Sequence, residues 1–146
     1  MKTILIIEDD INLVEMYQAK FSMEEFNVLT ASDGAEGVAV ALEEKPDVIL
    51  LDILMPKVNG FEVLKQLKES PESRDIPVIV YTNVGTAESD ERRDLAFSLG
   101  AADYLIKALH EPDAIVDRVN RLLTRPVDQT VEEATDNGEA ATSDLS

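Results

Sequence analysis

Residues 48–60 decide the fold of this chain, and they read Val-Ile-Leu-Leu-Asp-Ile-Leu-Met-Pro-Lys-Val-Asn-Gly. The apolar run before Asp52 has the length and branching of a strand that is buried on both faces, as in parallel sheets. A proline and an Asn-Gly pair then interrupt regular structure just before the amphipathic segment 61–69. One carboxylate is therefore delivered from a buried strand into a loop, and we predict that Asp52 is a functional group.

The same alternation of a buried strand and an amphipathic helix recurs along the chain. Parallel neighbours require crossover connections, so this alternation predicts helices on both faces of a parallel sheet. The specific prediction is a flavodoxin-like α/β fold, a doubly wound five-stranded sheet in the order 2-1-3-4-5. The predicted strands lie near residues 3–7, 28–29, 48–52, 78–82 and 104–106, and the predicted helices span about 11–23, 33–42, 61–69, 89–99 and 112–122.

Composition limits the classes of partner. The formal net charge is -17 at pH 7, and the chain contains no cysteine. Such a charge disfavours binding to nucleic acid or to an anionic membrane, and the lack of cysteine excludes disulfides and thiolate metal sites. The N-terminus does not read as a signal peptide, and no run approaches the ~20 apolar residues of a membrane span. We expect a cytoplasmic protein whose partners are basic proteins or metal ions.

The last part of the chain differs from the rest. Residues 125–146 are acidic, rich in Thr, Ala, Asp and Glu, and poor in large apolar side chains. This composition favours a disordered tail. We therefore predict a folded domain over residues 1–124 and a tail over 125–146 that contains no enzymatic or DNA-binding output domain.

Polar side chains follow the predicted strands at their carboxyl ends. Glu8 and Asp9 come after the first strand, Asp52 ends the third, and Thr82 and Lys107 end the fourth and fifth. In the predicted strand order Asp52 is central, with the acidic pair on one side and Thr82 and Lys107 on the other. Three carboxylates suit a hard cation such as Mg²⁺, and Mn²⁺ fits the same ligands. Beside a cation, Asp52 is a candidate nucleophile toward phosphorus, with Lys107 and Thr82 as partners of the phosphoryl oxygens.

Four motifs in this order carry a family resemblance. They are Ile-Ile-Glu-Asp-Asp at 6–10, Asp-Ile-Leu-Met-Pro-Lys-Val-Asn-Gly at 52–60, Val-Tyr-Thr at 80–82 and Gly-Ala-Ala-Asp-Tyr-Leu-Ile-Lys at 100–107. With them, residues 2–123 resemble the receiver domain of two-component response regulators, and they are similar to the stand-alone chemotaxis-type receivers. The resemblance implies that Asp52 accepts a phosphoryl group from a histidine kinase, a phosphotransfer protein or a small donor such as acetyl phosphate.

The resemblance also implies roles for the residues around Asp52. Asp9, Asp52 and the backbone carbonyl of Leu54 would bind Mg²⁺, and Glu8 would act mainly through water. Such a protein is a switch that catalyses its own phosphorylation and dephosphorylation, and we do not expect an enzyme in the usual sense.

The output of the switch is expected to be protein binding. Thr82 and Lys107 would contact the phosphoryl group, and Tyr104 would rotate inward as Thr82 moves. This rotation would remodel the face formed by the fourth helix, the fifth strand and the fifth helix, where an unidentified protein target would bind. The resemblance is compatible with a monomer or with a dimer linked to phosphorylation.

Several positions depart from the family pattern. Lys107 precedes Ala108, where the family usually has proline, and a cis bond to a non-proline residue costs about 3–4 kcal/mol, so we expect a trans bond. Asn83 replaces a very small residue and would narrow the entry of the phosphodonor. Leu54 and Val84 are apolar at positions that tune attack of water on the phosphoaspartate. Because neither can orient water, we predict a long-lived phosphorylated state.

Three alternative functions stay open at this point. A phosphorelay intermediate would pass its phosphoryl group on to a histidine phosphotransfer domain. A metal-dependent phosphatase with an aspartyl nucleophile is disfavoured, because such enzymes commonly want a second acid two residues after the nucleophile, where this chain has Leu54. A degenerate receiver that only binds a partner is disfavoured by the complete acidic cluster and by Lys107. His110 is expected to be a surface loop residue.

Overall fold

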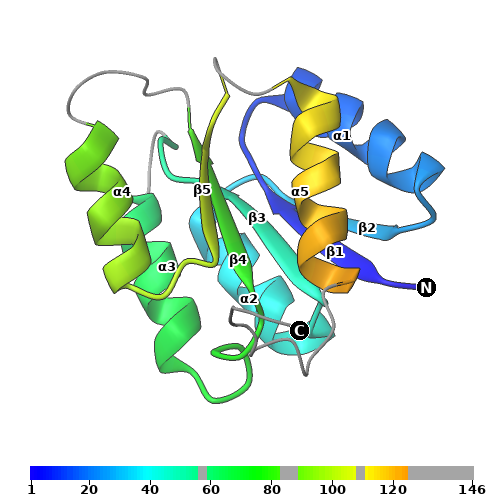
Figure 1. The fold of residues 1–146 in the computed structure, drawn as a ribbon. Helices are drawn as coiled ribbons and strands as arrows, with labels where there is room; N and C mark the ends of the chain where they lie inside the picture. The colour runs from blue at the N-terminus through cyan, green and yellow to red at the C-terminus, as the bar shows by residue number, and fades with distance from the viewer. Residues whose placement is uncertain (56–58, 83–88, 108–110, 125–146) are drawn as a thin grey trace, which may run out of the picture.

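Strands and helices alternate along the chain (Figure 1). The computed structural model describes residues 1–55, 59–82, 89–107 and 111–124. The strands are β1 (Thr3–Ile7), β2 (Asn27–Ala31), β3 (Val48–Asp52), β4 (Val78–Thr82) and β5 (Asp103–Ile106). The helices are α1 (Ile11–Met23), α2 (Gly34–Glu44), α3 (Gly60–Glu69), α4 (Ser89–Ser98) and α5 (Pro112–Thr124).

The strands form one parallel sheet in the order β2-β1-β3-β4-β5. This order confirms the predicted flavodoxin-like, doubly wound fold. Asp52 of β3 is in register with Tyr81 of β4, and Thr82 of β4 is in register with Ile106 of β5. The carboxyl ends of β1, β3, β4 and β5 therefore meet at one edge of the sheet.

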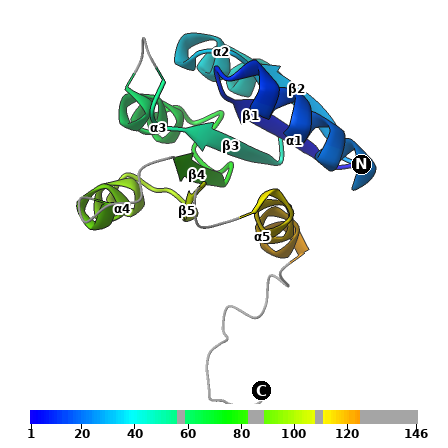
Figure 2. The ribbon, with the colours of Figure 1, turned by 90° about the horizontal axis from the view of Figure 1, so that it is seen from above.

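Two apolar clusters pack on the two faces of this sheet. Seen from above, α1 and α5 lie on one side of it, and α2, α3 and α4 lie on the other (Figure 2). Alternate residues of each strand contribute to the two clusters, because side chains along a strand point to opposite faces. The cluster under α1 and α5 contains the strand residues Ile4, Ile6, Val48, Leu50, Ile79, Tyr81 and Leu105.

Three helix ends carry residues that suit their positions. Asp10 caps α1, since its side chain accepts hydrogen bonds from the backbone N–H groups of Asn12 (3.0 Å) and Leu13 (3.3 Å). Gly100 follows α4 with a φ of 106°, the positive value expected of a left-handed glycine there. Pro112 is the first residue of α5, where its missing N–H costs nothing.

One strand is longer than predicted. β2 spans Asn27–Ala31, and each of its residues pairs with one residue of β1. β2 lies at the edge of the sheet and is only half-buried, so it lacks the continuous apolar run that marks the central strands.

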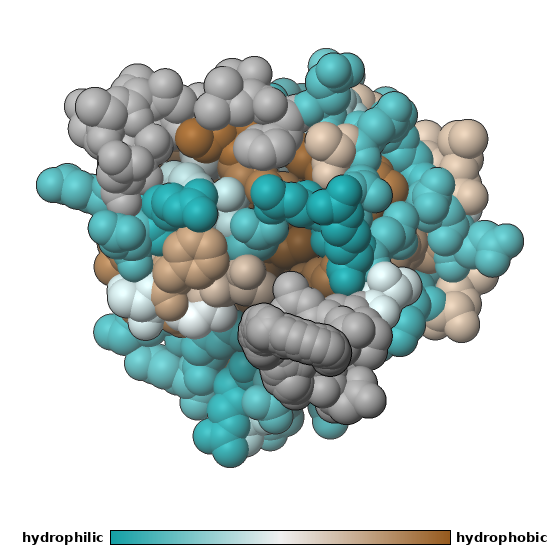
Figure 3. Space-filling model, viewed as in Figure 1, coloured by the Kyte–Doolittle hydropathy of each residue, from teal (hydrophilic) through white to brown (hydrophobic). Residues whose placement is uncertain are grey.

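The face that carries α4, β5 and α5 is mostly hydrophilic, and hydrophobic side chains are visible in a hollow beside α5 (Figure 3). On the described part of this face, Arg118 pairs with Asp103 and Arg121 pairs with Asp117 at 2.9 Å. Among the residues described, no helix combines the length and the apolar character that crossing a membrane requires. The predicted tail, 125–146, lies outside the described residues.

Candidate functional site

Strand geometry sends four polar side chains to the same side of the sheet. Residues two apart on a strand share a face, and this alternation continues one residue beyond β1 and β5. Each of the four follows, at a spacing of two, a residue of the cluster under α1 and α5. The pairs are Ile6 and Glu8, Leu50 and Asp52, Ile79 and Tyr81, and Leu105 and Lys107.

Lys107 joins the two sides of the site. Its Nζ lies 2.9 Å from Oε1 of Glu8 and 3.4 Å from Oδ2 of Asp52. The side chain of Lys107 is only 10% exposed, so water screens these ion pairs weakly. The backbone supports this position, because the N–H of Lys107 donates to the carbonyl of Thr82 at 2.7 Å.

Asp52 is a carboxyl group in an environment that disfavours its charge. Burial, with the negative charge of Glu8 in addition, raises the pKa of Asp52 to about 6. The backbone N–H of Leu54, which donates to Oδ1 at 3.0 Å, and the ammonium of Lys107 act in the opposite direction. A cation bound beside Asp52 would therefore stabilise a carboxylate that the surrounding protein leaves only partly compensated.

Glu8 is buried but well supplied with donors. Burial by itself would raise its pKa, but three hydrogen bonds together lower the pKa below its ordinary value. They come from the hydroxyl of Tyr81 (2.6 Å), from Nζ of Lys107 and from the backbone N–H of Asp10 (3.0 Å). Glu8 is consequently a fixed negative charge.

The acidic groups are arranged as a cation site. Glu8, Asp9 and Asp52 can each present a carboxylate oxygen so that all three atoms lie within 4.8 Å of one another. Asp9 is exposed while the other two are buried. Burial, with the neighbouring Glu8 in addition, raises the pKa of Asp9. Oxygen ligands with one side open to water are what Mg²⁺ prefers, since this ion keeps several waters.

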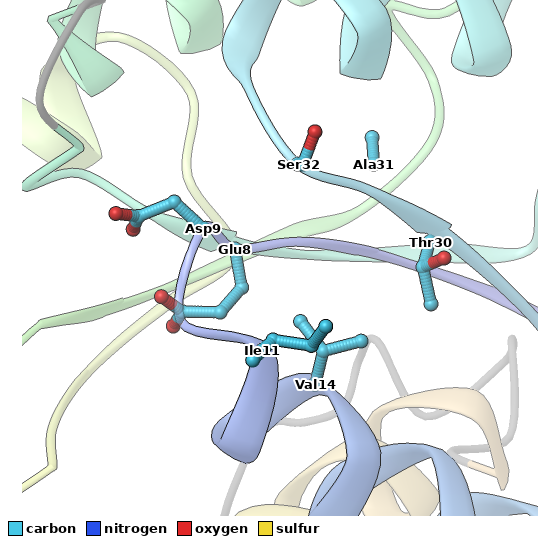
Figure 4. Close-up of a pocket in the computed structure, with 7 residues that line it drawn as sticks. All are labelled: Glu8, Asp9, Ile11, Val14, Thr30, Ala31 and Ser32. Carbon is cyan, nitrogen blue, oxygen red and sulfur yellow. The ribbon is translucent and has the colours of Figure 1, made fainter.

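A cavity of about 220 Å³ adjoins the acidic pair. Figure 4 shows the carboxylates of Glu8 and Asp9 projecting to the same side, away from Thr30. Ile11 and Val14 of α1 line the cavity from the opposite side to Ser32. Asp52 is not among the lining residues, so this cavity flanks the cluster and does not enclose it.

Other predicted site residues take distinct positions. Thr82 is buried at the end of β4, and its carbonyl accepts from Lys107. Leu54 is 47% exposed, and its backbone N–H contacts Asp52. Tyr104 is buried in the cluster with Ala96 of α4, and its hydroxyl has no hydrogen-bond partner among the residues described. Its inward rotation and the metal-binding role of the Leu54 carbonyl stay predictions. Asn83, Val84, the Lys107–Ala108 bond and His110 lie outside the described residues.

Tyr81 is a site residue that the sequence reasoning missed. The sequence places it in the fourth strand and in the Val-Tyr-Thr motif without a role of its own, yet its hydroxyl donates to Glu8 and its ring lies under the ammonium of Lys107. Two signals could have found it. It is a tyrosine at the end of a buried aliphatic strand, where its hydroxyl requires a partner, and it lies two residues after Ile79, on the face that also carries Asp52.

Comparison with known proteins decides the family. Residues 4–120 match the model of the response regulator receiver domain. The chain belongs to this family. The resemblance predicted from the sequence is thereby confirmed, and the acidic group of this receiver domain corresponds to the pocket in which receivers bind a divalent metal.

Individual relatives of the receiver domain differ in length. Protein PilH of Pseudomonas aeruginosa is 38% identical over 125 residues, which cover 84% of this chain and 98% of PilH. The DNA-binding dual master transcriptional regulator RpaA of a Synechocystis strain is 36% identical over 125 residues, covering 86% of this chain and 50% of RpaA. The chain spans about half the length of the first curated relatives that it matches.

Solved structures agree with this assignment. A putative response regulator from Chloroflexus aurantiacus has a TM-score of 0.75 at 29% identity, covering 85% of this chain and 98% of the other. The chemotaxis protein CheY4 of Vibrio cholerae has a TM-score of 0.74 at 26% identity, covering 83% and 98%. The receiver domain therefore shares its fold with chemotaxis-type receivers.

Proposed function

We propose that this receiver domain accepts a phosphoryl group on Asp52 and transmits the signal by binding another protein. The donor is a histidine kinase, a phosphotransfer protein or a small molecule such as acetyl phosphate. The observation that carries the proposal is the position of Lys107, whose Nζ lies 3.4 Å from Asp52 Oδ2 beside a cluster of three carboxylates. An ammonium there can offset the charge of an incoming phosphoryl group.

In the proposed reaction with a phosphohistidine donor, an oxygen of Asp52 forms a bond to phosphorus while the P–N bond to the donor's imidazole breaks. The electron pair of that bond stays on the imidazole nitrogen, and the product is an aspartyl phosphate. Lys107 and Thr82 would contact the phosphoryl oxygens. The protein thus promotes its own phosphorylation and dephosphorylation, and it acts as a switch more than as an enzyme.

Asp9 and Asp52 would hold a Mg²⁺ or Mn²⁺ ion together with the backbone carbonyl of Leu54. Glu8 would act mainly through water, because both of its oxygens already accept hydrogen bonds from Tyr81, Lys107 and Asp10. When bound, the ion would supply positive charge to the oxygens of the transferring phosphoryl group.

The proposed output is a change on the face of α4, β5 and α5. Tyr104 of β5 is buried in the same cluster as Ala96 of α4, and movement of Thr82 would reposition it. Nearly all of PilH aligns with this chain, which supports the receiver domain as the unit that carries the proposed switch. We expect this activity in the cytoplasm, from a monomer or from a dimer linked to phosphorylation.

Phosphorylation with a small donor tests the proposal. The protein is incubated with Mg²⁺ and acetyl phosphate, and its intact mass is followed. The native protein should gain one phosphoryl group, and Asp52→Asn should gain none. Asp75→Asn removes an exposed aspartate in the loop between α3 and β4 and should behave like the native protein.

Absence of the adduct in the native protein would refute the phosphoacceptor function. Rapid transfer from the labelled protein to a histidine phosphotransfer domain would instead identify a phosphorelay intermediate.

A further inference from the structure

One buried side chain contacts both charged groups that flank Asp52. Tyr81 is fully buried at 0% exposure. Its hydroxyl donates to Oε1 of Glu8 at 2.6 Å, and its ring centroid lies 4.4 Å from Nζ of Lys107. Tyr81 is also the register partner of Asp52 on the neighbouring strand. A single residue of β4 therefore connects the end of β1 with the end of β5.

The hydroxyl of Tyr81 fixes the direction of the Glu8 carboxylate. Oε1 accepts from Tyr81 and from Lys107, and Oε2 accepts from the backbone N–H of Asp10. Glu8 is only 2% exposed, so these donors replace the water that a free carboxylate would bind. Its negative charge is thus directed toward Lys107 and partly offset.

The ring of Tyr81 supports the ammonium of Lys107. The face of an aromatic ring attracts a cation within about 6 Å of its centroid, and more strongly where water is excluded. Nζ of Lys107 also lies closer to Glu8 (2.9 Å) than to Asp52 (3.4 Å). Lys107 therefore rests on Glu8 and Tyr81, a short displacement away from Asp52.

Tyr81 is itself held in place by a second aromatic ring. Tyr17 of α1 packs edge-on against it, with ring centroids 5.7 Å apart and an interplanar angle of 87°. This is the favourable T-shaped arrangement of two aromatic rings. Because Tyr81 is packed on one side and hydrogen-bonded on the other, it can set the positions of Glu8 and Lys107.

We propose that Tyr81 is a positioning residue for phosphoryl transfer: it holds Glu8 and Lys107 in a resting arrangement that Lys107 leaves for the phosphoryl group on Asp52. This inference rests on the proposed phosphoacceptor function. Without the hydroxyl, the charge of Glu8 is less offset, so a divalent cation in the adjacent cluster binds more tightly.

The first experiment measures Mg²⁺ dependence. Tyr81→Phe keeps the ring and removes only the hydroxyl, and it should lower the half-saturating Mg²⁺ concentration for phosphorylation by acetyl phosphate about three- to tenfold. Tyr17→Phe is the matched control, since its hydroxyl makes no hydrogen bond to Glu8 in the described structure. It should leave the Mg²⁺ requirement unchanged.

A tyrosine that only fills the core would not tighten Mg²⁺ binding when its hydroxyl is removed. An unchanged or increased Mg²⁺ requirement in folded Tyr81→Phe therefore overturns the positioning role. If the native protein itself is not phosphorylated, the proposed function fails and this inference fails with it, whereas a phosphorylated native protein beside a Tyr81→Phe variant with an unchanged Mg²⁺ requirement refutes the inference alone.

The second experiment uses the native protein and is independent of whether the variant folds. The ring current of Tyr81 should shift the ε-methylene protons of Lys107 upfield of those of the other lysines, with Lys107→Arg providing the assignment. Mg²⁺ with beryllofluoride, a phosphoryl mimic, should remove this shift as the ammonium leaves the ring. A Lys107 signal that is unshifted at rest, or that keeps its shift after the mimic has bound, overturns the inference.

Discussion

The negative charge of Asp52 destabilises the folded state. Its pKa is raised to about 6, mainly by burial, whereas an aspartate in an unfolded chain has a pKa of about 3.9. A raised pKa means that the folded state favours the protonated form. The stability that comes from this group is fully present below about pH 4 and is lost as the pH rises through about 6.

Replacing this carboxylate should therefore stabilise the metal-free protein. Asp52→Asn keeps the shape and the acceptor for the Leu54 N–H but removes the buried charge. At pH 8 the free energy of unfolding should rise by about 2–3 kcal/mol, and the gain should vanish near pH 4. Urea unfolding in the presence of a chelator measures both values. An equal gain at both pH values would show that the charge of Asp52 is not its cause.

We expect Leu54 to affect how long a phosphoryl group stays on the same carboxylate. Its side chain is 47% exposed and apolar, so it cannot orient a water molecule toward phosphorylated Asp52. We expect Leu54→Asn to shorten the lifetime of the phosphorylated protein severalfold, because an amide can hydrogen-bond the attacking water. A time course of phosphate release checks this, with Leu95→Asn, at another exposed leucine, as the control. An unaltered decay would remove the basis for predicting a long-lived state.

The connection between β3 and α3 is built around a close backbone approach. A Cβ placed on Gly60 would lie 2.2 Å from the Cα of Ile53, which no side chain can occupy. The N–H of Gly60 also donates to the carbonyl of Ile53 at 3.2 Å, and Leu54 bridges to Asn59. Because Ile53 directly follows Asp52, this contact determines how the chain leaves the proposed phosphoacceptor.

Gly60→Ala should for this reason be severely destabilising. The added methyl group meets backbone atoms that cannot move aside, and we expect a loss of about 3 kcal/mol or more in the free energy of unfolding. Chemical denaturation measures the loss. Gly34→Ala, at the start of α2, is the comparison, since an added Cβ there meets no such close neighbour among the described residues. Similar losses for both variants would argue against a special role of the Gly60 contact.

The whole molecule combines a net charge of -17 with a concentrated acidic site. Divalent cations can act on it in two ways, by general screening and by binding at the cluster. Only the second depends on particular carboxylates. Asp9 separates the two effects, because it is exposed and its removal leaves the buried Glu8–Lys107 pair in place.

Mg²⁺ should stabilise the native protein by binding to the folded state alone. At ten times its dissociation constant the gain in the free energy of unfolding should be about 1.4 kcal/mol, and a chelator should reverse it. Asp9→Asn should lose most of this gain. The measurement compares Mg²⁺ with NaCl at equal ionic strength. If Asp9→Asn gained as much as the native protein, the effect would be screening and not binding at the cluster.

The overall fold could be predicted because each central strand is a continuous apolar run that ends in a polar residue. Asp52, Glu8, Asp9 and Lys107 could be brought together from the strand order alone, since strand ends meet at one edge of the sheet. The extent of β2 could not, because an edge strand needs fewer apolar residues. The partner of the Tyr81 hydroxyl could not be predicted either: the hydroxyl reaches past β3 to Glu8, and this contact depends on side-chain conformation more than on strand order.

The shared face of Glu8, Asp52, Tyr81 and Lys107 also limits which changes in chain length the domain can tolerate. A single residue inserted within β3 ahead of Asp52 would turn its carboxylate to the opposite face, away from Lys107, whereas two would restore its direction. Insertions and deletions should therefore be accepted in the loops that follow the helices, at the amino ends of the strands. They should not be accepted within the strands, in the residues that directly precede the site. The spacing by twos makes this edge of the sheet intolerant of odd-numbered length changes.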